Sequence, residues 1–207
     1  QADSQLERTS LSLALTGRLP LSGGTISWSE GDDDPRRISM KRLRALSSVV
    51  DSPDVTAPEQ HMRVHDYVSE MLSYNLPIFG RSRASRWLAE RGLEELDGLW
   101  MDEISGEMNI ELMAALAQHS PSDLLVFDTP SRHLNHTYMW LPYLEELAAD
   151  EDHPRTVVAV VPHISESWHG ARAVVGRVPE ENVPAPVEGE IEPSNDSPEH
   201  GENAEKE

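Results

Sequence analysis

Two short apolar runs in this sequence each end on a residue that can transfer a proton. The run 123–128 ends with Asp128, and the run 156–162 is followed directly by His163. If both runs are parallel strands, their carboxyl ends lie at one edge of a sheet, where ligands and catalytic groups of such sheets gather. We therefore predict Asp128 and His163 as a pair of catalytic residues.

The loop after Asp128 adds imidazole side chains at His133 and His136. Imidazole and carboxylate groups bind divalent metals, and imidazole titrates near neutral pH. We predict a metal site that includes His133 and His136. The alternative is that Asp128 caps the turn before Pro130 and that the histidines are ordinary loop residues.

A third candidate site is a group of cations in the first quarter of the chain. The predicted partner-binding residues are Arg36, Arg37, Lys41 and Arg44, which share one side of an expected helix. Nucleic acid is an unfavoured partner because the whole chain carries a net charge of −20. The alternative is that this side of the helix is simply solvated.

The first half of the chain is expected to be mostly helical after an initial strand and turn over residues 11–28, where leucines alternate. Asp34 before Pro35 is typical of a helix start, and this helix is expected to run to about Val50. The further expected helices are 56–74, opened by the T-x-x-E capping box of Thr56 and Glu59, then 82–91, and 110–118 capped by Asn109.

The second half contains the clearest pattern, a strand, a helix and a second strand within 122–163. The strands 123–128 and 156–162 are continuously apolar, as expected of strands buried on both faces, and 138–149 reads as the helix between them. A βαβ unit has parallel strands. Residues 172–178 are expected to add an edge strand.

These elements together predict the fold class and the domain organisation. The class is α/β, or α+β, with a helical N-terminal half (34–119) followed by the βαβ unit and a small, mostly parallel sheet. One domain is expected over residues 1–179. The segment 180–207 holds ten acids, one Lys and four Pro, so it is expected to be a disordered acidic tail or docking arm.

Composition excludes several classes of site. The chain has no cysteine, which excludes disulfides, thiolate metal sites and cysteine nucleophiles. No run of about 18 apolar residues is present, so we expect a soluble chain that does not span a membrane. The sequence does not indicate a compartment.

The run Leu-Leu-Val-Phe-Asp-Thr-Pro, residues 124–130, resembles the strand and aspartate that coordinate magnesium in P-loop ATPases. The resemblance covers seven residues. That family also needs a G-x-x-x-x-G-K-[ST] loop, and in the glycine-containing segment 16–25 no Lys follows a glycine to reach a phosphate. The sequence therefore does not place the chain in this family.

The sequence is compatible with two functions. The first is a non-enzymatic structural or assembly component, such as a processed piece of a larger polypeptide or of a viral capsid. It rests on the start at Gln1, the charged arm and the lack of a catalytic motif. It needs no cofactor, and its partners are other protein subunits in a homo- or hetero-oligomer. The second is a small metal-dependent, hydrolase-like enzyme with a divalent metal at the carboxyl ends of strands 123–128 and 156–162. The sequence does not decide whether the chain is an enzyme.

Overall fold

The structure is a computed structural model that describes most of the chain. The described residues are 1–29, 34–75, 82–134, 136–166 and 168–175. The chain divides into a unit of residues 1–176 and a second of residues 177–207. The predicted tail 180–207 and the predicted boundary at 179 lie outside the described residues, so the architecture below is that of the first unit.

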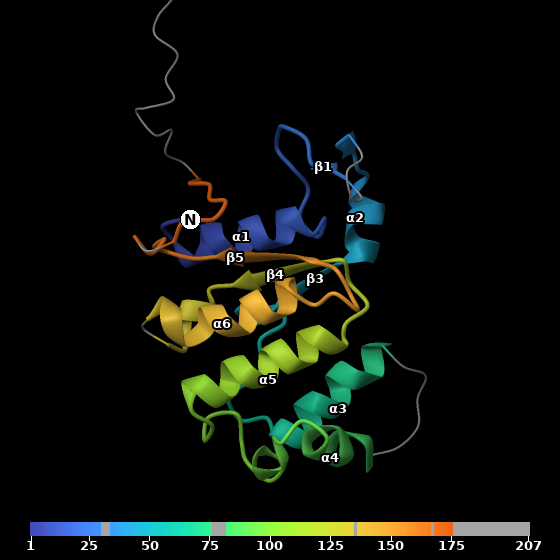
Figure 1. Ribbon diagram of the computed structural model, residues 1–207, viewed down its shortest axis with the longest axis vertical. Coiled ribbons are helices and arrows are strands. Elements are labelled where there is room, and N and C mark those ends of the chain that lie inside the picture. The colour runs from blue at the N-terminus through green and yellow to red at the C-terminus, as the bar shows by residue number, and fades with distance from the viewer. Residues whose placement is uncertain (30–33, 76–81, 135, 167, 176–207) are drawn as a thin grey trace, which may run out of the picture. The chain divides into compact units, whose positions relative to one another are not determined.

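A parallel sheet of three strands organises this unit (Figure 1). Its order is β3 (Ser47–Val50), β4 (Leu124–Asp128) and β5 (Thr156–Val160), and Asp128 lies opposite Val160. Helix α6 (Thr137–Ala148) connects β4 to β5. The predicted βαβ unit and the predicted mixed α/β class with a small parallel sheet are therefore confirmed.

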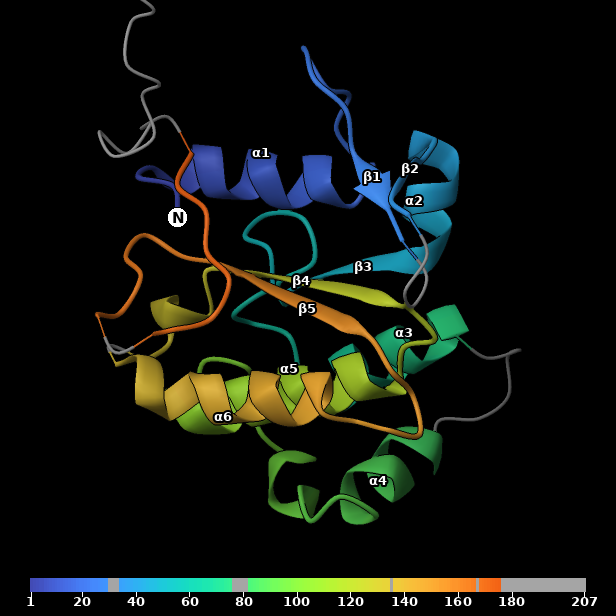
Figure 2. The same ribbon diagram turned by 45° about the horizontal axis from the view of Figure 1, so that its top comes forward.

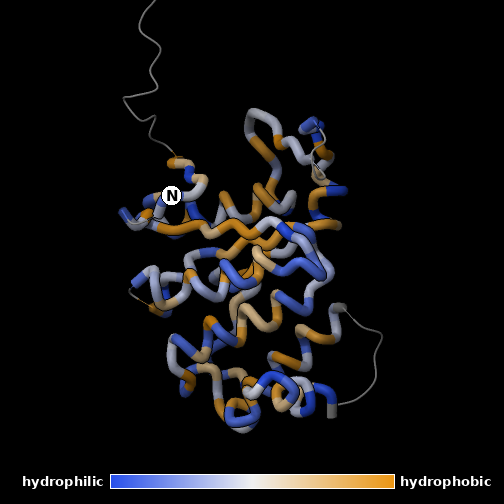
Figure 3. Tube along the Cα trace, viewed as in Figure 1, coloured by the Kyte–Doolittle hydropathy of each residue, from blue (hydrophilic) through white to orange (hydrophobic). Residues whose placement is uncertain are grey.

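Two helical layers cover the two faces of the sheet, and β4 lies between them (Figures 1 and 2). Leu124 and Val126 pack in the cluster on the side of α1 (Gln5–Leu15) and α2 (Met40–Leu46). Leu125 and Phe127 point the other way, into the larger cluster with α5 (Gly106–His119) and α6. All five residues of β4 are buried, which explains its uninterrupted apolar pattern. Hydrophobic residues accordingly follow the strands in Figure 3.

The remaining elements extend these layers. Helices α3 (Val64–Asn75) and α4 (Ser82–Ala89) and the 3₁₀ helix η1 (Glu94–Leu96) contribute to the larger cluster beside α5. The short strands β1 (Ser27–Trp28) and β2 (Arg36–Arg37) pair antiparallel, and a second 3₁₀ helix, η2 (Pro130–Arg132), follows β4. Within the described residues, no helix is both long enough and apolar enough to cross a membrane.

The predicted strand and turn over residues 11–28 is wrong at its beginning, because α1 extends to Leu15. Ser4 caps this helix, and Ser4 and Glu7 form a reciprocal capping box. Leu11 and Leu15 lie one helical turn apart and pack on the sheet. The alternating leucines therefore also fit a helical period, and the cap decides between the two structures.

The predicted helix from Asp34 to Val50 is also wrong in its extent. Ser39 caps α2, which ends at Leu46, and the chain continues directly as β3. Val49 and Val50 are buried in the sheet, where β-branched side chains pack well.

Three smaller expectations differ from the structure. Thr56 accepts a hydrogen bond from the Ser52 N–H, and α3 begins only at Val64. Ser105 caps α5, so the predicted cap Asn109 lies within the helix. Residues 171–175, the described part around the predicted edge strand, form no strand.

The end of α1 offers a test of how this helix is positioned. Gly17 and Gly24 have φ values of +69° and +78°, but a Cβ on Gly17 would lie 2.6 Å from the Met40 carbonyl oxygen, and one on Gly24 would meet nothing within 4 Å. We expect Gly24→Ala to cost about 1 kcal/mol for its backbone conformation. Gly17→Ala should cost about 1–2 kcal/mol more because α2 must move away. Urea unfolding of the two variants measures the difference, and equal losses would show that α1 and α2 are not held at this contact.

Candidate functional site

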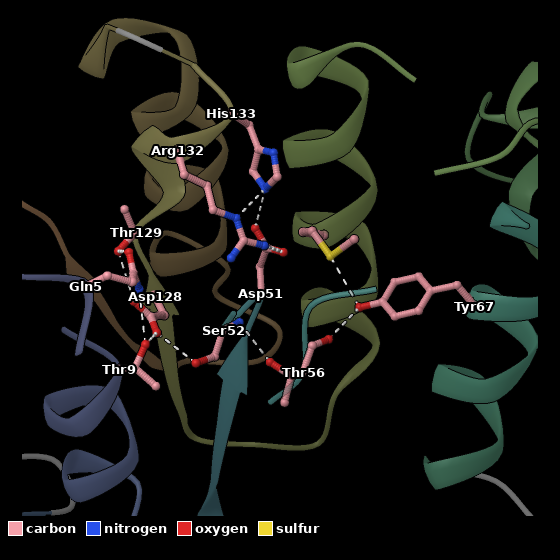
Figure 4. A network of polar contacts seen from close by, with 11 residues as sticks. Gln5, Thr9, Asp51, Ser52, Thr56, Tyr67, Asp128, Thr129, Arg132 and His133 are labelled. Atoms are coloured by element: carbon pink, nitrogen blue, oxygen red, sulfur yellow. Dashed lines mark hydrogen bonds and ion pairs between the residues drawn. The ribbon is translucent and has the colours of Figure 1, made fainter. Parts of the chain in front are cut away.

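The most unusual group at the carboxyl edge of the sheet is the Asp128 carboxylate, which is fully buried. It accepts hydrogen bonds from Thr9 Oγ1 at 2.7 Å, Ser52 Oγ at 2.7 Å, Thr129 Oγ1 at 2.9 Å and Gln5 Nε2 at 3.2 Å (Figure 4). All four donors are neutral, and among the described residues no Lys, Arg or His forms an ion pair with Asp128. Buried charges in proteins are normally paired or bound to a metal.

The first two turns of α1 supply two of these four contacts. The Ala2 N–H donates to the Val161 carbonyl oxygen at 3.1 Å, which fixes the residues before α1 at the end of β5. Gln5 and Thr9 then face Asp128 from one side of the helix, four residues apart. The free N–H groups and positive dipole end of such a helix attract anions.

Arg8 carries a positive charge at this end of α1, but its guanidinium is already hydrogen-bonded to other groups of the protein. Its guanidinium donates to the carbonyl oxygens of Ala2 and Asp3 at 3.1 and 2.7 Å, to Gln5 Oε1 at 3.0 Å and to Thr129 Oγ1 at 2.9 Å. The Arg8 side chain is thereby buried beside Asp128 and connected to it only through neutral groups.

Glu7 lies at the same helix end. Its carboxylate accepts the Ser4 N–H at 3.0 Å, and the Glu7 N–H donates to Ser4 Oγ at 3.2 Å. The Ser4 N–H and then the Ser4 hydroxyl hold the pKa of Glu7 below its ordinary value. Glu7 therefore carries a negative charge at neutral pH.

A second group of charges follows β3, directly before Ser52. Asp51 is 2% exposed and forms an ion pair with Arg132, and His133 Nε2 lies 2.8 Å from Asp51 Oδ2 and accepts a hydrogen bond from Arg132 Nε at 2.8 Å. Burial, and next the charge of Asp51, raise the pKa of Tyr67, whose hydroxyl donates to the Thr56 carbonyl oxygen. This cluster is internally neutralised, unlike the Asp128 carboxylate.

The predicted site residues are placed in different surroundings. Asp128 lies in the network described above, whereas His163, after β5, is exposed and makes no described hydrogen bond with it. His133 pairs with Asp51, and His136 stacks on Tyr138 with ring centroids 5.3 Å apart. Within the described residues no group of three or more His, Asp or Glu could hold a metal. The roles assigned to these residues remain predictions.

The four predicted partner-binding cations are exposed, but they do not lie on one helix. Arg36 and Arg37 belong to β2, and Lys41 and Arg44 belong to α2. Their partner-binding role also remains a prediction.

Comparison with known proteins identifies the fold. No protein-family model and no curated protein matches the sequence. A solved structure from Pyrococcus furiosus, assigned as an ABC transporter ATP-binding protein, has a TM-score of 0.54 at 12% identity, covering 80% of this chain and 78% of its own. A structure assigned as a cobalt transport ATP-binding protein has a TM-score of 0.44 at 19% identity, and the match covers 76% of this chain and 56% of that one. The first similarity shows a shared fold.

This finding contradicts both expected functions. The prediction of a structural or capsid-like assembly piece is wrong, and so are the metal-dependent hydrolase alternative and the expected absence of a cofactor, because the shared fold is that of an ATP-binding protein. The physical reason lies in the arrangement: a helix N-terminus at the carboxyl edge of a parallel sheet is suited to holding a phosphate ligand.

The structure also shows which signal the sequence reading missed. Residues 2–9 read A-x-x-x-x-E-R-T, which has the spacing of the G-x-x-x-x-G-K-[ST] loop with a cation and a hydroxyl at its end. Neither glycine of that loop is present and Arg8 stands at the position of its Lys, so a search for glycine followed by Lys finds nothing here. The capping box of Ser4 and Glu7, directly before Arg8 and Thr9, was the available signal.

The Asp51 ion pairs can be tested against a matched control. Asp51 and Asp54 both have left-handed backbones, with φ of 56° and 58°, but Asp54 is exposed. Asp51→Ala should destabilise the fold by about 3 kcal/mol more than Asp54→Ala, because it leaves Arg132 and His133 without their buried partner. Urea denaturation measures both. A difference below about 1 kcal/mol would mean that the pairs contribute little.

Proposed function

We propose that this chain is an ATP-binding domain that binds Mg²⁺ and ATP at the carboxyl edge of its sheet and works beside other protein subunits, as in a transporter. The fold similarity to an ABC transporter ATP-binding protein supports the class. The observation that carries the proposal is the buried Asp128 carboxylate, which has only neutral partners and lies 2.7 Å from the Thr9 hydroxyl, one turn into α1.

The residues around Asp128 fit a magnesium ion. In P-loop nucleotide hydrolases a Ser or Thr at the start of the helix and an Asp at the end of a strand hold Mg²⁺. Thr9 and Asp128 are this combination, and the Ser52 hydroxyl adds a third oxygen to the set that Mg²⁺ prefers. When bound, Mg²⁺ neutralises charge on the phosphates of a nucleotide.

The groups that would contact a phosphate fit that role less well than the groups around Asp128 fit Mg²⁺. The helix dipole of α1 and the positive charge of Arg8 favour an anion at this end of the sheet. To contact a phosphate, Arg8 must first leave the carbonyl oxygens of Ala2 and Asp3. Nucleotide binding at this site is therefore expected to be accompanied by a local rearrangement and to be weaker than the charges alone suggest.

The same residues favour ATP binding without fast ATP hydrolysis. Hydrolysis needs a group that positions the attacking water. The carboxylates of Asp51 and Asp128 are both engaged, and the Thr129 hydroxyl accepts from Arg8 and donates to Asp128. None of these three groups is therefore free for that task.

We also propose that the exposed cations Arg36, Arg37, Lys41 and Arg44 contact an acidic surface of a partner subunit. Opposite charges across an interface steer association and fix its orientation. The partner is a protein subunit, which agrees with the membership of the similar protein in a transporter.

The first test of this function is Mg²⁺-dependent ATP binding, measured by isothermal titration calorimetry with and without EDTA. We expect Mg²⁺ to strengthen ATP binding in the wild type. Asp128→Asn and Thr9→Val should lose at least about tenfold in affinity in the presence of Mg²⁺, because each removes a metal ligand.

The control for charge is Asp123→Asn, since Asp123 is exposed just before the opposite end of β4. It should bind ATP as the wild type does. ATP binding that is absent from the wild type, or that Asp128→Asn leaves unchanged, would contradict the proposed function.

A second test concerns turnover. We expect phosphate release from ATP to stay below about 1 s⁻¹, the lower end of typical enzyme rates, even at saturating Mg²⁺ and ATP. Release of inorganic phosphate from the purified chain measures it, with Asp128→Asn as the background. A rate well above this value would show that another group positions the water.

A further inference from the structure

We propose that Gln5 is a positioning residue whose side-chain amide keeps the Arg8 guanidinium apart from the Asp128 carboxylate. This separation leaves the carboxylate available to a cation. The link to Mg²⁺ rests on the proposed function, whereas the separation itself is a property of the chain without any ligand. The shared fold assigns no role to this side chain.

The two ends of the Gln5 amide face opposite charges. Gln5 Nε2 donates to Asp128 Oδ1 at 3.2 Å, and Gln5 Oε1 accepts from Arg8 Nη2 at 3.0 Å. An amide offers donors at its nitrogen and an acceptor at its oxygen. The reverse orientation would set donor against donor and acceptor against acceptor, so the two charges also determine how the amide points.

The Thr129 hydroxyl is the second neutral group between these charges. It accepts from Arg8 Nε at 2.9 Å and donates to Asp128 Oδ1 at 2.9 Å. Arg8 and Asp128 are both buried, and among the described residues no ion pair joins them. The cation and the carboxylate are therefore connected through an amide and a hydroxyl, and not directly.

Removal of the amide would leave one donor and one acceptor without a partner. Arg8 Nη2 would lose its acceptor, and Asp128 Oδ1 would lose one of its donors. Unsatisfied polar groups are costly at a buried site, and a guanidinium and a carboxylate form strong hydrogen bonds with each other. The two groups already share the Thr129 hydroxyl, so a direct pair needs only a short movement of the guanidinium. A cation would then have to compete with Arg8 for the carboxylate.

The first experiment measures binding of Mn²⁺ alone, followed by electron paramagnetic resonance of the free ion, since Mn²⁺ takes the same oxygen ligands as Mg²⁺. It compares the wild type with Gln5→Met, Arg8→Met and the variant that carries both changes. Met is an unbranched residue with high helix propensity, and it lacks both the amide and the charge. Gln118→Met, at an exposed position of α5, is the matched control. Circular dichroism checks that each variant is folded.

We expect Gln5→Met to bind Mn²⁺ at least about tenfold more weakly than the wild type, because the guanidinium pairs with the carboxylate. Gln118→Met should bind as the wild type does. The double variant should bind as Arg8→Met alone does, since it has no guanidinium to pair with Asp128. A loss that persists in the double variant would show that Gln5 only supports the structure. That result, or unchanged or tighter binding in Gln5→Met, would overturn the inference.

The second experiment needs no metal. Urea unfolding of Arg8→Met, Asp128→Asn and their combination gives the coupling between the two charges, and the same cycle is repeated in Gln5→Met. We expect the coupling factor in the unfolding equilibrium constant to rise at least about tenfold in the second cycle. A rise without Mn²⁺ binding to any variant would refute the proposed Mg²⁺ site and leave the separation standing. Mn²⁺ binding that depends on Asp128, with no rise in coupling, would do the reverse.

Discussion

The burial of the Asp128 carboxylate is the constraint around which the carboxyl edge of the sheet is built. Removing a carboxylate from water is costly unless hydrogen bonds replace the water. Asp128 obtains four such bonds, from Thr9 and Gln5 of α1, from Ser52 after β3 and from Thr129. These donors come from three separate parts of the chain. The requirement to solvate one charge therefore fixes how α1, β3 and β4 meet.

The distribution of cations around this charge is equally specific. Asp51 and Ser52 are adjacent after β3, yet Asp51 pairs with the Arg132 guanidinium and contacts His133, whereas the Ser52 hydroxyl, a neutral group, donates to Asp128. On the other side, Arg8 is bound by carbonyl oxygens and by Thr129. One carboxylate is thus paired with a guanidinium, and the other has only neutral partners. Only the second has the electrostatic character of a cation site.

The sequence predicted the parts of this arrangement that depend on local pattern. Strand β4 was found because burial on both faces requires a continuous apolar run, and Asp128 was found because it ends that run. Strand β5 was found from an equally apolar run, although most of its residues are only half-buried. Helix α1 was missed because alternating leucines fit a strand as well as a helix. Its contribution, Gln5 and Thr9, is separated from Asp128 by more than a hundred residues, and no local pattern connects them. His163 follows β5 as expected but is exposed, because register alone does not decide which way a side chain turns after a strand.

The start of α1 shows how stability and ligand binding can draw on the same groups. The unpaired N–H groups of a helix end can be satisfied by a side chain or by a bound anion, but a given N–H cannot fully serve both. A glycine-rich loop leaves them to the ligand and gains nothing from them when no ligand is present. The reciprocal bonds of Ser4 and Glu7 satisfy two of them within the chain, which stabilises the helix whether or not a ligand is bound.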